Sequence, residues 1–137
     1  MLEDAIEFAR LHSEKQNISW RVADFNEINT EHDISICSLV CHHFYGKVLV
    51  DFIYKMSNTA KLGVVINDLH RHWFAFHSIG LLSRIFSKSH LVKNDAKLSV
   101  LKGFKIAEWR HFLSQLGFKN YSIRWIWAFR HLIILRK

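Results

Sequence analysis

The sequence lacks several features that define common protein classes. Its 137 residues include no proline, only five glycines and two cysteines. No run of about 18 uninterrupted apolar residues is present, which argues against a membrane-spanning helix. Residues 1–4 combine neither a basic stretch nor a long apolar stretch, so they do not resemble a signal peptide. We therefore expect a cytoplasmic protein with no membrane span.

The two cysteines, Cys37 and Cys41, lie in one short apolar run. On an extended strand, two residues four positions apart are roughly 13 Å apart, too far for a disulfide. We expect them to be small buried side chains of a reducing compartment. A zinc site would need tighter spacing and a second pair of ligands, so we predict no metal.

What the sequence contains is typical of a folded domain. Half of its residues are hydrophobic, with 5 tryptophans and 11 phenylalanines, which predicts a packed core. The length suits a single domain, 1–137. The net charge of +7 is compatible with nucleic acid or an anionic membrane surface. Because the basic residues form no block of like charge, we favour an ordinary solvated surface and expect no nucleic-acid partner.

The hydrophobic pattern alternates between strand and helix periods. Helical spacing begins at Leu2 and ends at residues 15–17, and it returns over residues 47–57, 71–87 and 106–116. Gly117 is well placed to end the last helix. Short apolar runs predict strands at residues 18–23, 33–39, 62–67, 121–127 and 132–135, whereas 89–105 is expected to be a polar loop or cap. This order predicts an α/β parallel sheet with right-handed crossovers, closed by an antiparallel hairpin.

The segment from Asp33 to Phe44 is the most informative part of the chain. Its apolar run is typical of a strand buried on both faces, and two adjacent histidines, His42 and His43, follow it. In open parallel sheets the functional residues gather beyond the carboxyl ends of the strands. We therefore expect these histidines at the rim of an active site.

Four segments in this order resemble class I S-adenosylmethionine-dependent methyltransferases, over nearly the whole chain. They are Val22-Ala23-Asp24, Asp33 through Phe44, Val65-Ile66-Asn67-Asp68-Leu69-His70 and Leu98 through Phe104. The resemblance implies an α/β, Rossmann-like methyltransferase sheet that is mainly parallel, with a C-terminal antiparallel hairpin whose last strand inserts antiparallel.

One feature of that family is missing from the sequence. The family's first strand ends in a glycine-rich turn, where glycine allows close backbone approach to the cofactor. The five glycines here are neither paired nor clustered, and all lie further along the chain. Residues 1–5 resemble the start of the helix after the family's second strand. We therefore interpret the chain as a truncated methyltransferase domain that lacks an N-terminal segment, is inactive alone and forms homo-oligomers through an exposed sheet edge.

The resemblance also implies residues that bind the cofactor, S-adenosylmethionine in a complete form. Asp24 would contact the adenine amine and Phe25 would pack on the adenine, while Ser38 and Leu39 would lie beside the cofactor. The alternatives are a turn or cap role for Asp24 before Glu27, a core role for Phe25, and ordinary strand roles for the other two.

Three histidines are candidate catalytic bases. His42, His43 or His70 could deprotonate an acceptor hydroxyl because imidazole titrates near neutral pH. The alternative is that His42 and His43 are loop or surface residues. Asp68 and Arg71 would line the acceptor pocket by position. A metal set is tempting, made of Asp68, His70, His72, His42 and His43. A metal needs three or four converging ligands, which sequence cannot show.

The predicted function is methyl transfer to a small aromatic or lipophilic acceptor. The alternative is a non-catalytic basic and aromatic interaction module that binds a membrane surface or nucleic acid. Two segments favour that alternative: the aromatic helix of residues 73–86, and the hairpin with Trp125, Trp127, Arg124 and Arg130. Core packing explains the helix more simply, and for the hairpin we prefer a half-buried edge of the sheet.

Overall fold

The computed structural model describes residues 2–11, 17–86 and 89–137, which form two compact units, Met1–Thr30 and Glu31–Lys137. The first unit contains helix α1 (Leu2–Leu11) and a short 3-10 helix, η1 (Phe25–Glu27). The start of α1 is as predicted, while its predicted end at residues 15 and 16 lies outside the described residues.

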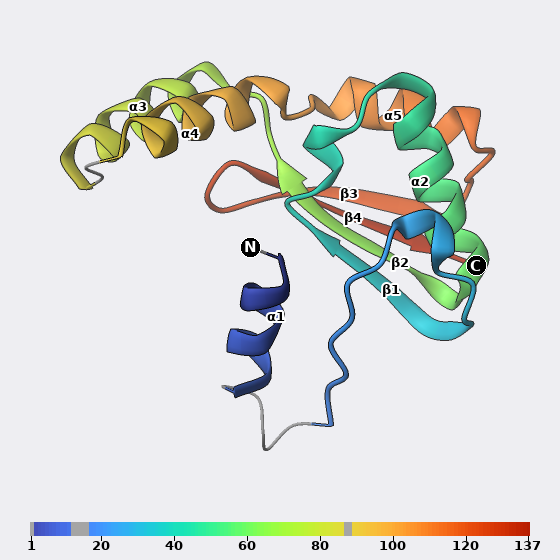
Figure 1. Cartoon of the computed structure of the whole chain (residues 1–137). Coiled ribbons are helices and arrows are strands. Elements are labelled where there is room, and N and C mark those ends of the chain that lie inside the picture. Colours follow the sequence, from blue (N-terminus) through green and yellow to red (C-terminus); the bar gives the residue numbers. More distant parts are fainter. Residues whose placement is uncertain (1, 12–16, 87–88) are drawn as a thin grey trace. The chain divides into compact units, whose positions relative to one another are not determined.

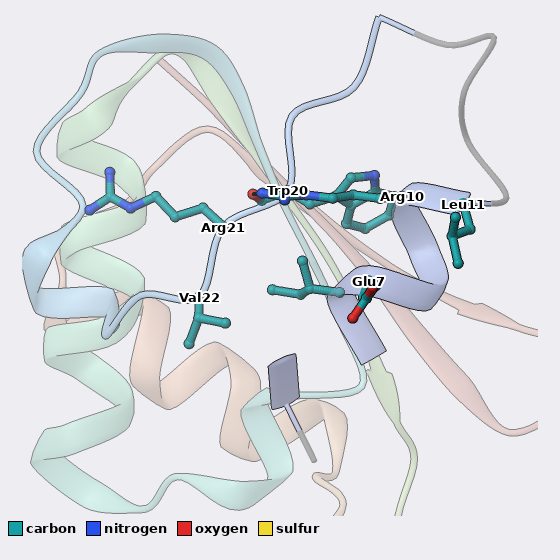
Figure 2. A pocket seen from close by; sticks show the side chains of 7 residues that line it. Glu7, Arg10, Leu11, Trp20, Arg21 and Val22 are labelled. Atoms are coloured by element: carbon teal, nitrogen blue, oxygen red, sulfur yellow. Dashed lines mark hydrogen bonds between the residues drawn. The ribbon is translucent and has the colours of Figure 1, made fainter. Parts of the chain in front are cut away.

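The strand predicted for residues 18–23 is wrong. Residues 17–24 have neither helix nor strand, and the Trp20 carbonyl accepts a hydrogen bond from the Arg10 guanidinium at 3.4 Å. A short apolar run becomes a strand only beside a partner, and no described strand pairs with this one. Side chains of α1 and of residues 20–22 instead line a pocket of about 610 Å³ within this unit (Figure 2).

The second unit is built on a four-stranded sheet in the order β1-β2-β4-β3 (Figure 1). The strands are β1 (His32–Ser38), β2 (Ala60–Leu69), β3 (Tyr121–Ile126) and β4 (Arg130–Arg136). β1 and β2 are parallel, and β4 is antiparallel to both of its neighbours. Three strands thus run in one direction, which confirms the mainly parallel sheet and the insertion of the last strand.

Four helices complete this unit: α2 (Gly46–Thr59), α3 (Trp73–Phe86), α4 (His90–Lys102) and α5 (Ile106–Gln115). Figure 1 shows α2 and α5 over one face of the sheet, and α3 and α4 side by side beyond one end of it. The helix predicted for residues 47–57 is confirmed, and those predicted for 71–87 and 106–116 are confirmed over residues 73–86 and 106–115. None of the described helices is both long and apolar enough to span a membrane.

The loop predicted for residues 89–105 is wrong, because most of that segment is α4. Its composition is mixed and polar, so periodicity does not reveal it. α4 packs along α3, where Gly80 leaves room for Lys97: a Cβ on Gly80 would lie 2.5 Å from the Lys97 Cε. The helix ends at Gly103, whose amide donates to the Ser99 and Val100 carbonyls.

The core lies between the sheet and the helices over one face. Buried apolar side chains from both layers meet there: Val64, Ile66, Ile133, Leu135, Leu49, Ile53, Trp109 and Leu113. Burial of β1 on both faces was predicted and is wrong. Ser35 and Cys37 are buried, whereas Ile34 and Ile36 are 50% and 74% exposed. The reason is that β1 is an edge strand of the described sheet and is covered on one face.

Candidate functional site

The chain turns sharply after β1. Leu39 has a φ of +57°, a left-handed conformation that is uncommon for a residue with a side chain, and its amide donates to the Asn67 carbonyl at 2.8 Å. A 3-10 helix, η2 (Cys41–His43), follows. This turn corrects the predicted cysteine geometry: the Cys37 and Cys41 Sγ atoms are 3.8 Å apart, and both thiols are free and buried.

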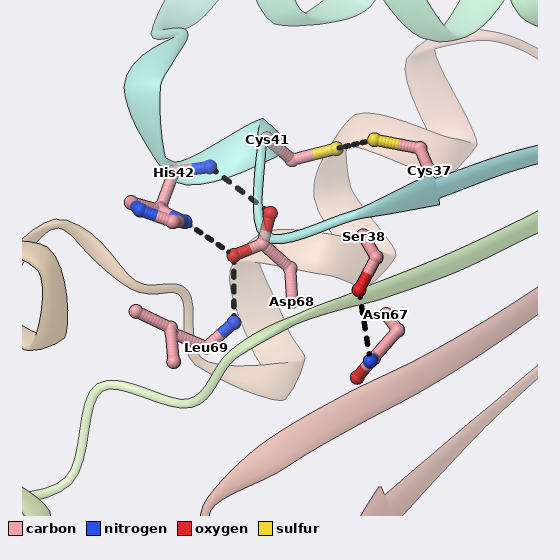
Figure 3. Close-up of polar contacts among 7 residues, drawn as sticks. All are labelled: Cys37, Ser38, Cys41, His42, Asn67, Asp68 and Leu69. Carbon is pink, nitrogen blue, oxygen red and sulfur yellow. Dashed lines mark hydrogen bonds and ion pairs between the residues drawn. The ribbon is translucent and has the colours of Figure 1, made fainter. Parts of the chain in front are cut away.

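His42 and Asp68 form a buried pair where the parallel strands β1 and β2 end (Figure 3). The His42 Nδ1 donates to the Asp68 Oδ1 at 2.6 Å, and the His42 amide donates to the Oδ2 at 3.1 Å. The Leu69 amide also donates to the carboxylate, at 2.6 Å. Asp68 is 0% exposed, so its contacts hold η2 against the end of β2. Asp68 was predicted to line the acceptor pocket. Its carboxylate could bind an acceptor directly only if these hydrogen bonds were rearranged.

Ser38 and Asn67 lie beside this pair on neighbouring strands (Figure 3). The Asn67 side-chain amide donates to the Ser38 hydroxyl at 3.2 Å. The Asn67 Oδ1 is buried and has no hydrogen-bond partner among the described residues. A buried acceptor without a partner is uncommon in folded proteins, so this end of the sheet offers an unused polar atom to a bound molecule.

The other two candidate bases have different surroundings. His43 is exposed, and its ring lies 4.2 Å from that of His42. His70 follows β2 directly, and its Nδ1 is buried without a partner among the described residues. Burial lowers the pKa of His70, and His72 and Lys105 act in the same direction. His70 is therefore a neutral imidazole near pH 7.

Arg71 was predicted to contact the acceptor, but it has a partner within the protein. Its guanidinium donates to the Glu108 Oε1 at 2.6 Å, and both side chains are half-buried. Burial opposes ionisation of Glu108, but the Lys105 amide and Arg71 together hold the pKa of this carboxyl below its usual value. Arg71 thus links the end of β2 to α5.

A second buried histidine was missed by the sequence reasoning. His131 lies on β4, directly opposite Asp68 on β2, is 0% exposed and has no hydrogen-bond partner on either ring nitrogen among the described residues. Its ring lies 4.4 Å from that of His70. A signal was available, because His131 alternates in phase with the buried Ile133 and Leu135.

An apolar cavity of about 570 Å³ lies next to His70. Residues from the end of β2, from α3 and α4, and from the β3–β4 turn line it. Among the described residues, no three His, Cys, Asp or Glu side chains are placed to hold a metal ion.

Comparison with protein-family models finds no match for this chain, and neither does comparison with curated proteins. Solved structures do match. A candidate O-methyltransferase of Nostoc punctiforme has 15% identity and a TM-score of 0.65, covering 99% of this chain and 41% of its own. The magnesium protoporphyrin IX methyltransferase of Synechocystis with bound SAH has 15% identity and a TM-score of 0.61, covering 100% and 60%. The plantazolicin methyltransferase, also with SAH, has 14% identity and a TM-score of 0.67, covering 96% and 64%.

The fold is that of a class I methyltransferase. This chain spans 41% to 64% of the length of these three structures. Within the methyltransferase fold, His42, Ser38, Leu39, Asp68, His70 and Arg71 all follow or end the two parallel strands. These residues therefore lie at one end of the sheet, while their roles as site residues stay predictions.

Asp24 and Phe25 belong to the first unit, and their contacts are given within that unit. The Asp24 carboxylate accepts hydrogen bonds from the Asn26 amide and the Asn26 side chain, at 2.8 and 2.9 Å, and so caps η1. This is the cap role considered as the alternative for Asp24, and it leaves the predicted adenine contact of both residues as a proposal.

Proposed function

We propose that this chain carries the acceptor side of an S-adenosylmethionine-dependent methyltransferase site and acts on a small aromatic or lipophilic acceptor. The observation that supports this most is the His42–Asp68 pair at the carboxyl ends of two parallel strands in a methyltransferase fold. Open parallel sheets place their ligands at this edge. A histidine oriented by a carboxylate is a suitable general base.

In this proposal His42 is the base and Asp68 positions it. The carboxylate accepts a hydrogen bond from the His42 Nδ1–H, which leaves the lone pair on Nε2. The Nε2 would take the proton of an acceptor hydroxyl. The methyl carbon would then be bonded to that oxygen in place of the donor sulfur, which would leave as the thioether of S-adenosylhomocysteine. Asp68 would stabilise the resulting imidazolium, and the apolar cavity would exclude water from the acceptor.

The methyl donor would lie beside the turn after β1. The unpartnered Asn67 Oδ1 and the left-handed backbone at Leu39 fit a ligand contact at this turn. Ser38 and Leu39 would hold one side of the donor. S-adenosylmethionine, when bound, supplies an electrophilic methyl group. Because the sequence contains no glycine-rich turn, we propose that these 137 residues alone bind the donor weakly and are inactive.

Donor binding is the direct test of this proposal. Calorimetric titration of the chain with S-adenosylmethionine should show weak binding, with a Kd on the order of 0.1–1 mM. ATP shares the adenosine but has no methionine portion, so it serves as a matched ligand and should bind at least several-fold more weakly. No binding of S-adenosylmethionine at millimolar concentration, or equal binding of ATP, would reject the proposal.

The interaction-module alternative predicts a different result. Trp127 is 87% exposed and Trp125 is 50% exposed, close in sequence to Arg124 and Arg130. A module of that kind would bind single-stranded oligonucleotides with an affinity that falls steeply with salt. Such binding, together with no response to S-adenosylmethionine, would favour the alternative.

A further inference from the structure

Helix α3 is apolar on the side that faces solvent. It packs along α4 beyond one end of the sheet (Figure 1), and Ala75 and Ser83 are buried on one side of it. On the other side, Trp73, Leu81 and Ile85 are 70%, 61% and 65% exposed, and their spacing places them on one face of the helix. We call this the outer face of α3. Because surface helices normally carry polar residues there, core packing accounts for only one side of this helix.

The β3–β4 turn extends this apolar surface. Its Trp127 is 87% exposed. The turn lies along α3, because the Phe129 ring is 5.8 Å from the Phe74 ring and because Trp127 and Leu82 line one cavity. The His70 amide donates to the Phe129 carbonyl at 2.9 Å, which ties the turn to the end of β2. Exposed apolar side chains that gather in this way mark an interaction surface more often than scattered ones do.

The two segments that form this surface carry positive charge without negative charge. The sequence has no Asp or Glu from residue 69 to 94, which includes all of α3, or from 109 to 137, which includes the β3–β4 hairpin. Arg84 is exposed on α3 directly before Ile85, and Arg124 and Arg130 lie on the two strands that flank the turn. The surface therefore complements a partner that offers both an apolar layer and negative charge.

Charge and side-chain type favour a lipid surface over the other partners that could cover this face. A second copy would bring the same positive charges, such as those of Arg84 and Arg130, to both sides of the contact. A nucleic acid would neutralise the arginines, but its bases stack on aromatic rings and would leave Leu81 and Ile85 without an apolar partner. A bilayer with anionic lipids supplies hydrocarbon for the aliphatic side chains and phosphate for the arginines. Tryptophan is also enriched at the boundary between membrane and water.

We propose that the outer face of α3 and the β3–β4 turn bind the surface of a bilayer that contains anionic lipids. α3 has 14 residues and is about 21 Å long, and it lies in the plane of the interface. Leu81, Ile85 and Trp127 enter the boundary of the hydrocarbon layer, while Arg84 contacts lipid phosphates. This inference is independent of the proposed methyl transfer, because it uses none of the residues proposed for the reaction.

Flotation with large vesicles measures this binding. Vesicles of phosphatidylcholine with about 30% phosphatidylglycerol should bind half of the chain at a lipid concentration on the order of 0.1 mM, as a single myristoyl chain does. Vesicles of phosphatidylcholine alone should bind at least about tenfold more weakly. Raising the salt concentration from about 0.05 M to about 0.5 M should weaken binding to the anionic vesicles without abolishing it, because salt screens the arginines but leaves the apolar contacts.

Two matched pairs of variants separate the outer face from the rest of the protein. Leu62 is 64% exposed, like Leu81, but it lies near the start of β2, the end of that strand farther from α3. L81E should weaken binding to anionic vesicles at least about tenfold and L62E by less than about twofold, although both change the net charge equally. R84Q should weaken it about fivefold, the contribution of one basic residue at an anionic surface. R110Q, which alters an exposed arginine of α5, should weaken it by less than about twofold.

Tryptophan fluorescence reports whether the surface enters the bilayer. Lipids brominated in their acyl chains should quench the fluorescence of the bound chain, because Trp73 and Trp127 reach the hydrocarbon boundary. The double variant W73F/W127F should lose more than half of this quenching and keep the emission of the fully buried Trp109.

Several outcomes would overturn the proposal. They are no binding to anionic vesicles at about 1 mM lipid, equal binding to vesicles without anionic lipid, equal effects of L81E and L62E, and quenching that is unchanged in W73F/W127F. Self-association that L81E abolishes, without vesicle binding, would assign this face to a second copy instead. Oligonucleotide binding that R84Q weakens, without vesicle binding, would assign it to nucleic acid.

Discussion

The buried His131 should make the stability of this protein strongly dependent on pH. Burial lowers the pKa of His131 to about 4, His70 lowers it in the same sense, and Asp68 opposes the change. The unfolded chain therefore binds a proton more readily than the folded one between pH 6.5 and pH 4. Stability is full above pH 6.5 and is lost as the pH falls through this window.

The size of this loss follows from the difference in pKa. Each unit of pKa corresponds to about 1.4 kcal/mol, so linkage gives a loss of about 2 kcal/mol at pH 5 and about 3 kcal/mol at pH 4, relative to pH 7. H131L removes this contribution. It also removes two buried nitrogens that have no hydrogen-bond partner among the described residues, which should raise the free energy of unfolding at pH 7 by about 1–3 kcal/mol.

Urea unfolding at pH 7, 5 and 4 measures both effects. Fluorescence of the fully buried Trp109 reports on the core, and H77Q serves as a control that removes an exposed histidine. Between pH 7 and pH 4, the unaltered chain and H77Q should lose about 3 kcal/mol more than H131L does. Equal losses in all three proteins would refute the reasoning. A lower stability of H131L at pH 7 would show that the ring nitrogens have partners in solution.

Three further predictions concern the turn after β1 and the sheet edge. D68N should lower the free energy of unfolding by about 2–3 kcal/mol, because the carboxylate binds the amide and ring of His42. D51N, which breaks a surface pair, should change it by less than 1 kcal/mol; equal effects would contradict the buried pair. Leu39 is left-handed, so L39G should be tolerated within about 1 kcal/mol, whereas L39V should cost about 1–2 kcal/mol; thermal unfolding giving the opposite order would argue against this turn. The exposed Ile36 on the edge strand predicts self-association that I36K weakens; sedimentation of the unaltered chain as a monomer at high concentration would count against it.

The sheet could be predicted because its signals are local. Residues 33–39 and 62–67 are short apolar runs bounded by polar residues, and the close spacing of the last two runs forces a hairpin. The segments that were predicted wrongly depend on contacts with distant parts of the chain. α4 has a mixed composition and gains its apolar contacts from α3, while residues 18–23 have strand-like side chains but pair with no described strand.

The site could be predicted only in part. His42 and Asp68 were named separately, but their pairing depends on the parallel register that aligns Ser38 with Asn67, which no local pattern encodes. The predicted distance between the two cysteines was wrong for a related reason. Nothing in the sequence marks Leu39 as a left-handed residue, and that single residue turns the chain back.

The position of β4 sets the order in which the sheet can form. β1 and β2 are parallel neighbours joined through α2, and they can pair while the later part of the chain is still unstructured. β3 has no such option, because β4 lies between it and β2. Until β4 is available, the edge of β2 stays open and β3 has no partner in the described sheet. Residues 130–136 therefore connect β3 to the pair of β1 and β2. Pairing of segments so distant in sequence is slow, because the entropy of closing the loop is lost before the stabilising contacts form. A substitution that weakens β4 should expose two strand edges at once during folding, which makes this segment the most sensitive point for aggregation.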